Sequence, residues 1–305
     1  MAINCTCNNT LQNTGSPDCP PVMQIARKFI FVPKYDSAGN ENKLLKADVD
    51  KAEMIIKINE SNALNRYFPT AQVDNVEDTR AEPVTQEFSS GKIITVRDGA
   101  RTAISYIPLG STQELGAYQS FGCADFGCYI LDAGGNFIYY DKGDDYAYPI
   151  QVDNETFNAM LIKATDAEVQ MVMLTWQWKL NQKDANLRFI ASDALDFDVE
   201  DLNGLFNTTA SYSNQATTGF DVVLSESDFG EGISDILTGD VACYDNSGAS
   251  PVLVSLSSWT ESTQVEGFYS AVFTAPQSSG DTLYLDITKN GYDWSGVKKV
   301  VLTIP

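Results

Sequence analysis

The stretch VMLTWQW at residues 172–178 alternates large apolar side chains with other residues. Successive side chains of a β-strand point to opposite faces, so this alternation predicts a half-buried strand with Trp176 and Trp178 on one face. Directly before it, Thr165 and Glu168 have the spacing of a helix capping box and predict a helical turn. The sequence on the N-terminal side of this strand is also rich in β-forming residues.

The runs that predict further strands are separated by turn signals such as SSG at 89–91, DG at 98–99 and AGG at 133–135. These runs are residues 26–32, 83–88, 92–96, 101–107, 128–131, 136–140 and 146–152. Residues 47–58 (ADVDKAEMIIKI) have apolar side chains at helical spacing and acids at the front, which predicts a short helix. Residues 25–206 are therefore expected to form a mainly antiparallel β-barrel or sandwich with one or two short helices.

The two ends of the chain have different patterns. Residues 1–24 have no apolar period and are expected to form an extended N-terminal arm. Residues 207–218 (NTTASYSNQATT) are polar and predict a linker. Beyond them, residues 219–305 contain short alternating runs at 220–224, 241–244, 252–257, 269–274, 283–287 and 297–304. Strands at this spacing predict an immunoglobulin-like β-sandwich, although Cys243 stands alone and the Cys-Trp-Cys pattern of antibody domains is missing.

Charge and composition limit the classes of function. A chain of 305 residues fits two domains, and its 43% apolar content is enough for real cores. The net charge is −21, with 17 basic and 29 acidic residues in 1–210 and 3 and 12 in 211–305. Because phosphate contacts need Lys and Arg, binding of nucleic acid is disfavoured in both parts. We see no membrane segment or signal peptide, so a soluble protein made in the cytoplasm is expected.

Most catalytic chemistry is excluded by residue inventory. The chain has no histidine, which removes Ser-His-Asp and Cys-His catalysis, and it has no phosphate-binding glycine loop or nucleophile-elbow motif. The six cysteines lack the paired C-x-x-C spacing of structural zinc sites, so free thiols are favoured over zinc. They are Cys5, Cys7, Cys19, Cys123, Cys128 and Cys243.

The residue types that are present still allow two kinds of site. The acids at 193–201 (Asp193, Asp196, Asp198, Glu200 and Asp201) and at 141–145 (Asp141, Asp144 and Asp145) could hold calcium or supply a carboxylate pair. Solvated acidic turns explain both clusters more simply. Trp294 lies in a predicted loop, where sugar binding stays open, whereas Trp176 and Trp178 suit a core or a subunit contact, and Trp259 is a fourth aromatic candidate. We predict no catalytic, cofactor-binding or metal-binding residue, and no enzyme.

Several motifs in the first 205 residues resemble bacteriophage tail tube proteins of the Bacteroidota-phage type. They are NRYFP at 65–69, VEDTR at 76–80, EFSSG at 87–91, VRDGAR at 96–101, GCYILD at 127–132, YPI at 148–150 and KATDAEVQ at 163–170. The C-terminal part, with EGFYS at 266–270 and a predicted closing strand at 297–304, is similar to immunoglobulin-like domains appended to phage tube and capsid subunits.

The resemblance implies a virion structural protein whose copies form stacked rings, usually hexameric, around a channel that conducts DNA. Its implied partners are other copies of itself and other tail proteins, with DNA only as passing cargo, no membrane, and weak contact of the C-terminal domain with the host surface. Assembly would take place in the host cytoplasm. A capsid decoration, head-fibre or tail adaptor protein is the first alternative, and a cell-surface or carbohydrate-binding adhesin is the second. Asp144, Asp145, Asp196 and Asp198 are candidates for acids that face the channel.

Overall fold

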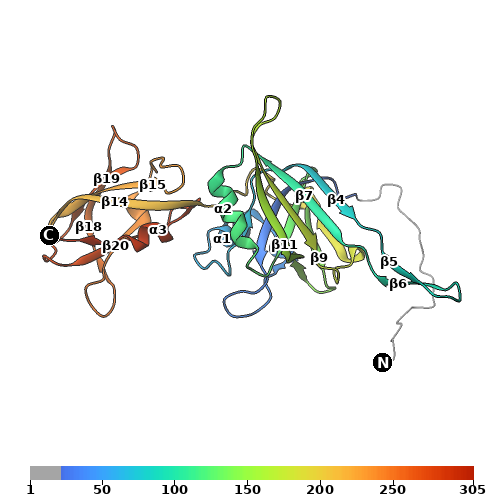
Figure 1. Ribbon diagram of the computed structural model, residues 1–305. Helices are drawn as coiled ribbons and strands as arrows, with labels where there is room; N and C mark the ends of the chain where they lie inside the picture. Colours follow the sequence, from blue (N-terminus) through green and yellow to red (C-terminus); the bar gives the residue numbers. More distant parts are fainter. Residues whose placement is uncertain (1–21) are drawn as a thin grey trace.

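The computed structural model describes residues 22–305, which are mostly β (Figure 1). The helices are α1 (Lys51–Ile58), α2 (Thr112–Phe121) and α3 (Ser295–Lys299), with 3-10 turns at Lys46–Asp48, Asp184–Asn186, Ser192–Ala194 and Thr238–Asp240. The strands before residue 200 are β1 (Ala26–Pro33), β2 (Leu44–Leu45), β3 (Phe68–Pro69), β4 (Asp74–Arg80), β5 (Val84–Glu87), β6 (Ile93–Arg97), β7 (Arg101–Pro108), β8 (Phe126–Asp132), β9 (Phe137–Asp141), β10 (Tyr146–Tyr148), β11 (Ile150–Ile162), β12 (Met171–Trp178) and β13 (Leu187–Ile190). The later strands are β14 (Phe206–Ala216), β15 (Gly219–Glu226), β16 (Val241–Asp245), β17 (Val252–Val254), β18 (Leu256–Glu261), β19 (Phe268–Phe273), β20 (Thr282–Ile287), β21 (Tyr292–Asp293) and β22 (Leu302–Thr303).

The first unit is one large antiparallel sheet that curls on itself. Its main path runs β2-β10-β9-β8-β11-β12-β7-β4, with β1 paired to β8, β3 to β1 and β13 to β9. The segment leading into β4 returns to β1, where Thr70 N–H donates to the Phe29 carbonyl and Val73 N–H to the Arg27 carbonyl, both at 2.8 Å. These bonds bring the β4 end of the path back to β1, which pairs with β8, so this part of the sheet closes on itself and encloses an interior.

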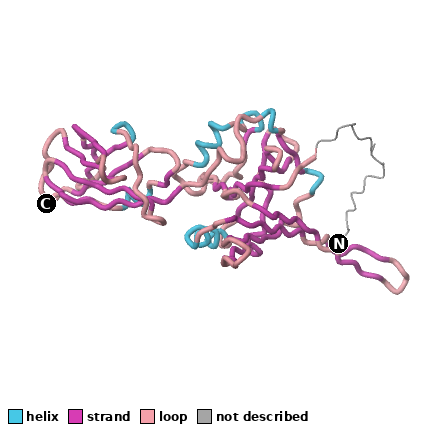
Figure 2. The backbone as a smooth tube through the Cα atoms, turned by 90° about the horizontal axis from the view of Figure 1, so that it is seen from above, coloured by secondary structure: helices cyan, strands magenta, loops and turns pink. Residues whose placement is uncertain are grey.

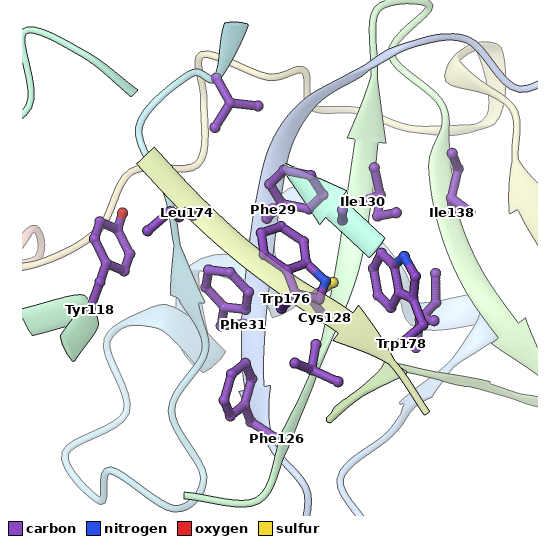
Figure 3. Packing of buried hydrophobic residues seen from close by; sticks show 14 of the residues in the cluster. Phe29, Phe31, Tyr118, Phe126, Cys128, Ile130, Ile138, Leu174, Trp176 and Trp178 are labelled. Atoms are coloured by element: carbon purple, nitrogen blue, oxygen red, sulfur yellow. The ribbon is translucent and has the colours of Figure 1, made fainter. Parts of the chain in front are cut away.

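That interior is filled by aromatic side chains (Figure 3). The alternation at 172–178 is confirmed, because every second residue of β12 is buried and Trp176 is fully buried. Phe31 meets Trp176 edge to face at 5.8 Å between ring centroids, a favoured geometry for aromatic pairs. At the end of the sheet near the C-terminal unit, α2 contributes Tyr118 to this core (Figure 1).

A second core lies on the other face of β1, β8 and β9, where α1 and the segment 195–205 cover it. Met54 and Ile58 of α1 are buried there, as the helical spacing of 47–58 predicts. Asp50 caps α1 by accepting a hydrogen bond from Glu53 N–H at 2.8 Å. The predicted helix is therefore confirmed from Lys51 onward.

The C-terminal unit packs a five-stranded sheet, β18-β19-β15-β14-β21, against a four-stranded sheet, β17-β16-β20-β22, around one apolar core. The polar linker expected at 207–218 is wrong, because these residues form most of β14, which pairs with β15 from Thr208 to Ala216. Ala210 is buried and Tyr212 is half-buried toward the core, while the serines and asparagines face outward. The polar composition thus belongs to the solvated face of a strand.

Two other expectations need correction. The Thr165 hydroxyl accepts a hydrogen bond from Glu168 N–H at 3.1 Å, as the capping pattern predicts. The helical turn itself is wrong, because Thr165 N–H donates to the Glu168 carbonyl at 2.9 Å and closes a loop between β11 and β12. The strand expected at 297–304 begins as α3 and leaves only β22 as strand. The N-terminal arm expected at 1–24 lies outside the described residues up to position 21.

Candidate assembly surface

A long hairpin projects from the curled sheet, on the side away from the C-terminal unit (Figures 1 and 2). Its lower part is the pair β4–β7, with Arg80 opposite Arg101, and its upper part is the pair β5–β6. Between them, Ala81 N–H donates to the Ala100 carbonyl at 2.8 Å, so the two arms stay together. The chain reverses only once, at residues 89–91, where Gly91 has φ of +75°.

Gly99 marks the junction of the two parts of the hairpin. A Cβ atom at this position would lie 1.6 Å from the Ala81 carbonyl oxygen, so only glycine fits between the arms. The turn expected at Asp98-Gly99 is therefore wrong. Glycine is needed there for the close approach of two backbones, and the chain continues from β6 into β7 without reversing.

Charged pairs anchor the base of the hairpin to the body. The Arg101 guanidinium donates to both carboxylate oxygens of Asp78, with Nε at 2.9 Å from each, and its Nη1 lies 2.8 Å from Asp184. Arg80 also reaches Asp184, at 2.7 Å. The Arg101 guanidinium lies 5.2 Å from the ring centroid of Trp178, within cation–π range. The base is thereby fixed against the aromatic core.

The upper part of the hairpin is amphipathic, although every residue of β5 and β6 is exposed. Cross-strand partners share a face, and Gln86 pairs with Ile94 while Thr85 pairs with Thr95. One face therefore carries Val84, Gln86, Phe88, Ile94 and, opposite Phe88, Lys92, and the other carries Thr85, Glu87, Ile93 and Thr95. Val84, Phe88 and Ile94 are 44%, 42% and 38% exposed.

Such a ribbon is an unusual feature for a monomer. Two strands without a packed face are marginally stable in water, and exposed apolar ribbons invite pairing with other chains. In the described part of the chain, β5 and β6 form a two-stranded sheet of their own, and Phe88 and Ile94 keep about two fifths of their surface exposed. We call the face formed by Val84, Phe88 and Ile94 the apolar ribbon face.

A cavity of about 280 Å³ lies beside the base of the hairpin. Its lining is largely apolar and includes Ile25, Phe29, Ile130 and Trp178, with Asp78 and Arg101 at the hairpin side. Ile25 is 49% exposed, which places it at the mouth. The Trp178 indole N–H is buried and has no hydrogen-bond partner among the described residues.

The acidic cluster at 193–201 serves the local structure. Asp196 accepts a hydrogen bond from Lys51 N–H at 2.6 Å at the start of α1, and Asp201 pairs with the Lys51 ammonium at 2.5 Å. Asp198 accepts hydrogen bonds from the backbone N–H groups of Glu200 and Asp201. The acidic turn expected at Asp141–Asp145 is likewise tied to its surroundings, through the 3.0 Å bond from Lys46 to Asp141.

Under the 198–203 turn lies Lys28, whose side chain is almost completely buried. Its ammonium donates to the Leu202 carbonyl, and the Asn203 side-chain oxygen lies 3.4 Å away. Burial lowers the pKa of Lys28 from 10.5 to about 8, and the charges of Asp198, Glu200 and Asp201 offset part of that effect. The sequence pattern does not reveal this buried cation, because Lys28 lies within a strand that reads as simply β-rich.

The tryptophans do not form a platform for sugar. Trp294, left open for binding on sequence, is buried and donates its indole N–H to the Lys289 carbonyl at 2.7 Å. Trp259 stacks on Tyr269 inside the C-terminal core, at 4.9 Å between centroids. Trp176 and Trp178 belong to the core of the first unit.

Within residues 22–305, no three His, Cys, Asp or Glu side chains gather as a metal site would require. Cys123, Cys128 and Cys243 are free thiols, and burial raises the pKa of Cys128 well above its ordinary value. Cys5, Cys7 and Cys19 lie outside the described residues. No helix in the described part of the chain is long and apolar enough to span a membrane.

Comparison with known proteins returned no match: no family model, no curated protein and no solved structure resembles this chain closely enough to be matched.

Proposed function

We propose that this chain is a structural subunit that assembles with copies of itself, as the ring-forming subunit of a phage tail tube. The apolar ribbon face is the observation that carries the proposal. It places Val84, Phe88 and Ile94 in water on a two-stranded ribbon, and burial of such side chains stabilises a contact by about 25 cal/mol for each Å² removed from water. In a ring or tube, neighbouring subunits would bury this apolar surface.

The charge of the chain suits the DNA-conducting role. A net charge of −21 repels phosphate, so an acidic channel wall would let DNA slide without binding. Of the four acids expected to face the channel, Asp144, Asp196 and Asp198 accept hydrogen bonds from neighbouring groups, such as the 2.7 Å bond from the Tyr148 hydroxyl to Asp144. Asp145 lies on an exposed bend, and its carboxylate has no hydrogen bond or ion pair among the described residues. Asp145 is therefore the better candidate for the channel wall.

The C-terminal unit fits an appended immunoglobulin-like domain. Its two facing sheets share one core, and its 12 acids against 3 basic residues (counted over 211–305) would keep it solvated on the outside of a tube. In this proposal the protein catalyses nothing, and assembly and passage of DNA are its whole function.

Negative-stain electron microscopy of the purified protein tests the proposal. We expect rings or tubes for the natural chain and single particles for Phe88→Asp, since a charge on the apolar ribbon face cannot be buried against a neighbour. Thr95→Asp, on the opposite face of the same ribbon, is the matched control and should assemble. A natural chain that stays monomeric at every concentration would sink the proposal.

A further inference from the structure

We infer that the apolar ribbon face of one copy docks at the cavity beside the hairpin base of a second copy. The inference rests on the proposed function, because it names the contact through which copies would join. Both surfaces of the proposed contact are present on every copy of the chain. One is the exposed ribbon around Phe88 and Ile94, and the other is the apolar cavity whose mouth includes Ile25.

The cavity has the chemistry of a socket for an apolar side chain. At about 280 Å³ it has room for one or two large side chains, and Phe29, Ile130, Ile138 and Ile150 line it.

Charge favours a second copy as the occupant. The chain carries −21, so two copies repel each other over most of their surfaces. The upper part of the hairpin is an exception, since residues 84–97 contain two basic residues, Lys92 and Arg97, and one acidic residue, Glu87. At the cavity, Asp78 and Arg101 neutralise each other in a bidentate pair. The contact therefore joins a slightly basic ribbon to a neutral apolar site, where repulsion is lowest.

The hairpin does not fill the cavity of its own chain. It leaves the body at Arg80 and Arg101 and points away from the curled sheet in both views (Figures 1 and 2). A ribbon that reaches outward from one copy and a cavity that accepts it on another make a head-to-tail contact, which forms a ring where the rotation between neighbours closes.

Complementation between two defective variants tests this contact. Phe88→Asp keeps an intact cavity but a damaged ribbon, and Ile25→Asp keeps an intact ribbon but a charged cavity mouth. Each alone should assemble at least tenfold less readily than the natural chain, as measured by analytical ultracentrifugation. Mixed, they should form one-to-one dimers and nothing larger, since each pair has only one working ribbon and cavity.

Controls keep the outcomes distinct. Ile56→Asp, which charges a still more exposed isoleucine on α1, should assemble normally, and Ile25→Trp should block the mouth without adding charge. Normal assembly of both Ile25 variants, or a mixture that stays monomeric, overturns this inference while rings of the natural chain still support the proposed function. If deleting residues 1–21 abolishes assembly and the mixture gives no dimer, the contact between copies depends on that segment and the inference is wrong.

Discussion

At the scale of single residues, Lys28 is the side chain whose environment departs most from its usual one. An ammonium buried beneath the 198–203 turn binds the Leu202 carbonyl, and no described carboxylate forms an ion pair with it. A lysine with a lowered pKa destabilises the folded state while its ammonium is charged. This penalty disappears as the pH rises from the pKa of the folded state to the pKa of the unfolded state.

The resulting prediction concerns stability against pH. Between about pH 8 and 10.5 the unfolded chain binds more protons at Lys28 than the folded chain, so this group makes the free energy of unfolding rise with pH. We expect the natural chain to gain on the order of 2 kcal/mol relative to Lys28→Met between pH 7 and 10. Urea unfolding of both proteins across this range measures the difference, and Lys51→Met, which changes an exposed lysine, should show no such gain. A difference that is flat with pH would contradict the assignment.

At the scale of elements, the hairpin depends on one backbone contact. Gly99 allows the two arms to approach at Ala81, and the ladder continues from β4–β7 into β5–β6 only because of it. The base is held separately by Arg101 and its carboxylates. The upper ribbon can therefore be loosened without unfolding the body.

Gly99→Ala should separate the arms, because its Cβ would overlap the Ala81 carbonyl oxygen. We expect amide exchange in residues 84–97 to accelerate at least tenfold, with exchange at Trp176 unchanged. Gly116→Ala is the control, since a Cβ there meets nothing within 4 Å and alanine favours the interior of α2. Hydrogen exchange measured by mass spectrometry compares the two; equal exchange in both variants would show that the close approach is unimportant.

At the scale of the whole molecule, the two units are joined by more than the chain that connects them. Arg66 of the first unit pairs with Asp293 of the C-terminal unit at 2.6 Å, and their side chains are only 10% and 18% exposed. Gly291 N–H also donates to the Asn59 side chain at 3.0 Å. Although burial by itself raises it, the pKa of Asp293 is lowered overall, chiefly by the hydrogen bond from Arg66.

Removing one partner should uncouple the units. Arg66→Met leaves the Asp293 carboxylate without its ion-pair partner, which we expect to cost about 3 kcal/mol and to split thermal unfolding into two transitions in calorimetry. Because folding lowers the pKa of Asp293, the ion pair stabilises the fold fully at pH values above the pKa of the unfolded state. The stabilisation is lost as the pH falls through the pKa of the folded state, so acid should uncouple the two units of the natural chain as well. Asp286→Asn breaks the exposed pair with Lys298 and should cost less than about 1 kcal/mol. A single transition in Arg66→Met would show that the pair does not couple the units.

The amino-acid sequence by itself determined the mostly β character, the buried alternation at 172–178, helix α1 and the hairpin turn at 89–91, because each rests on periodicity or turn chemistry within a few residues. The start of helix α2 could also have been predicted from the sequence, because Ser111 and Glu114 have the spacing of a capping box. The role of Gly99, the buried Lys28 and the Arg66–Asp293 pair were decided only by the tertiary structure. Each depends on backbone or side chains brought together from distant parts of the chain, and residues 66 and 293 are too far apart in sequence for any local pattern to connect them. The polar residues of β14 read as a linker for the same reason, since only packing against the facing sheet shows which of them turn inward.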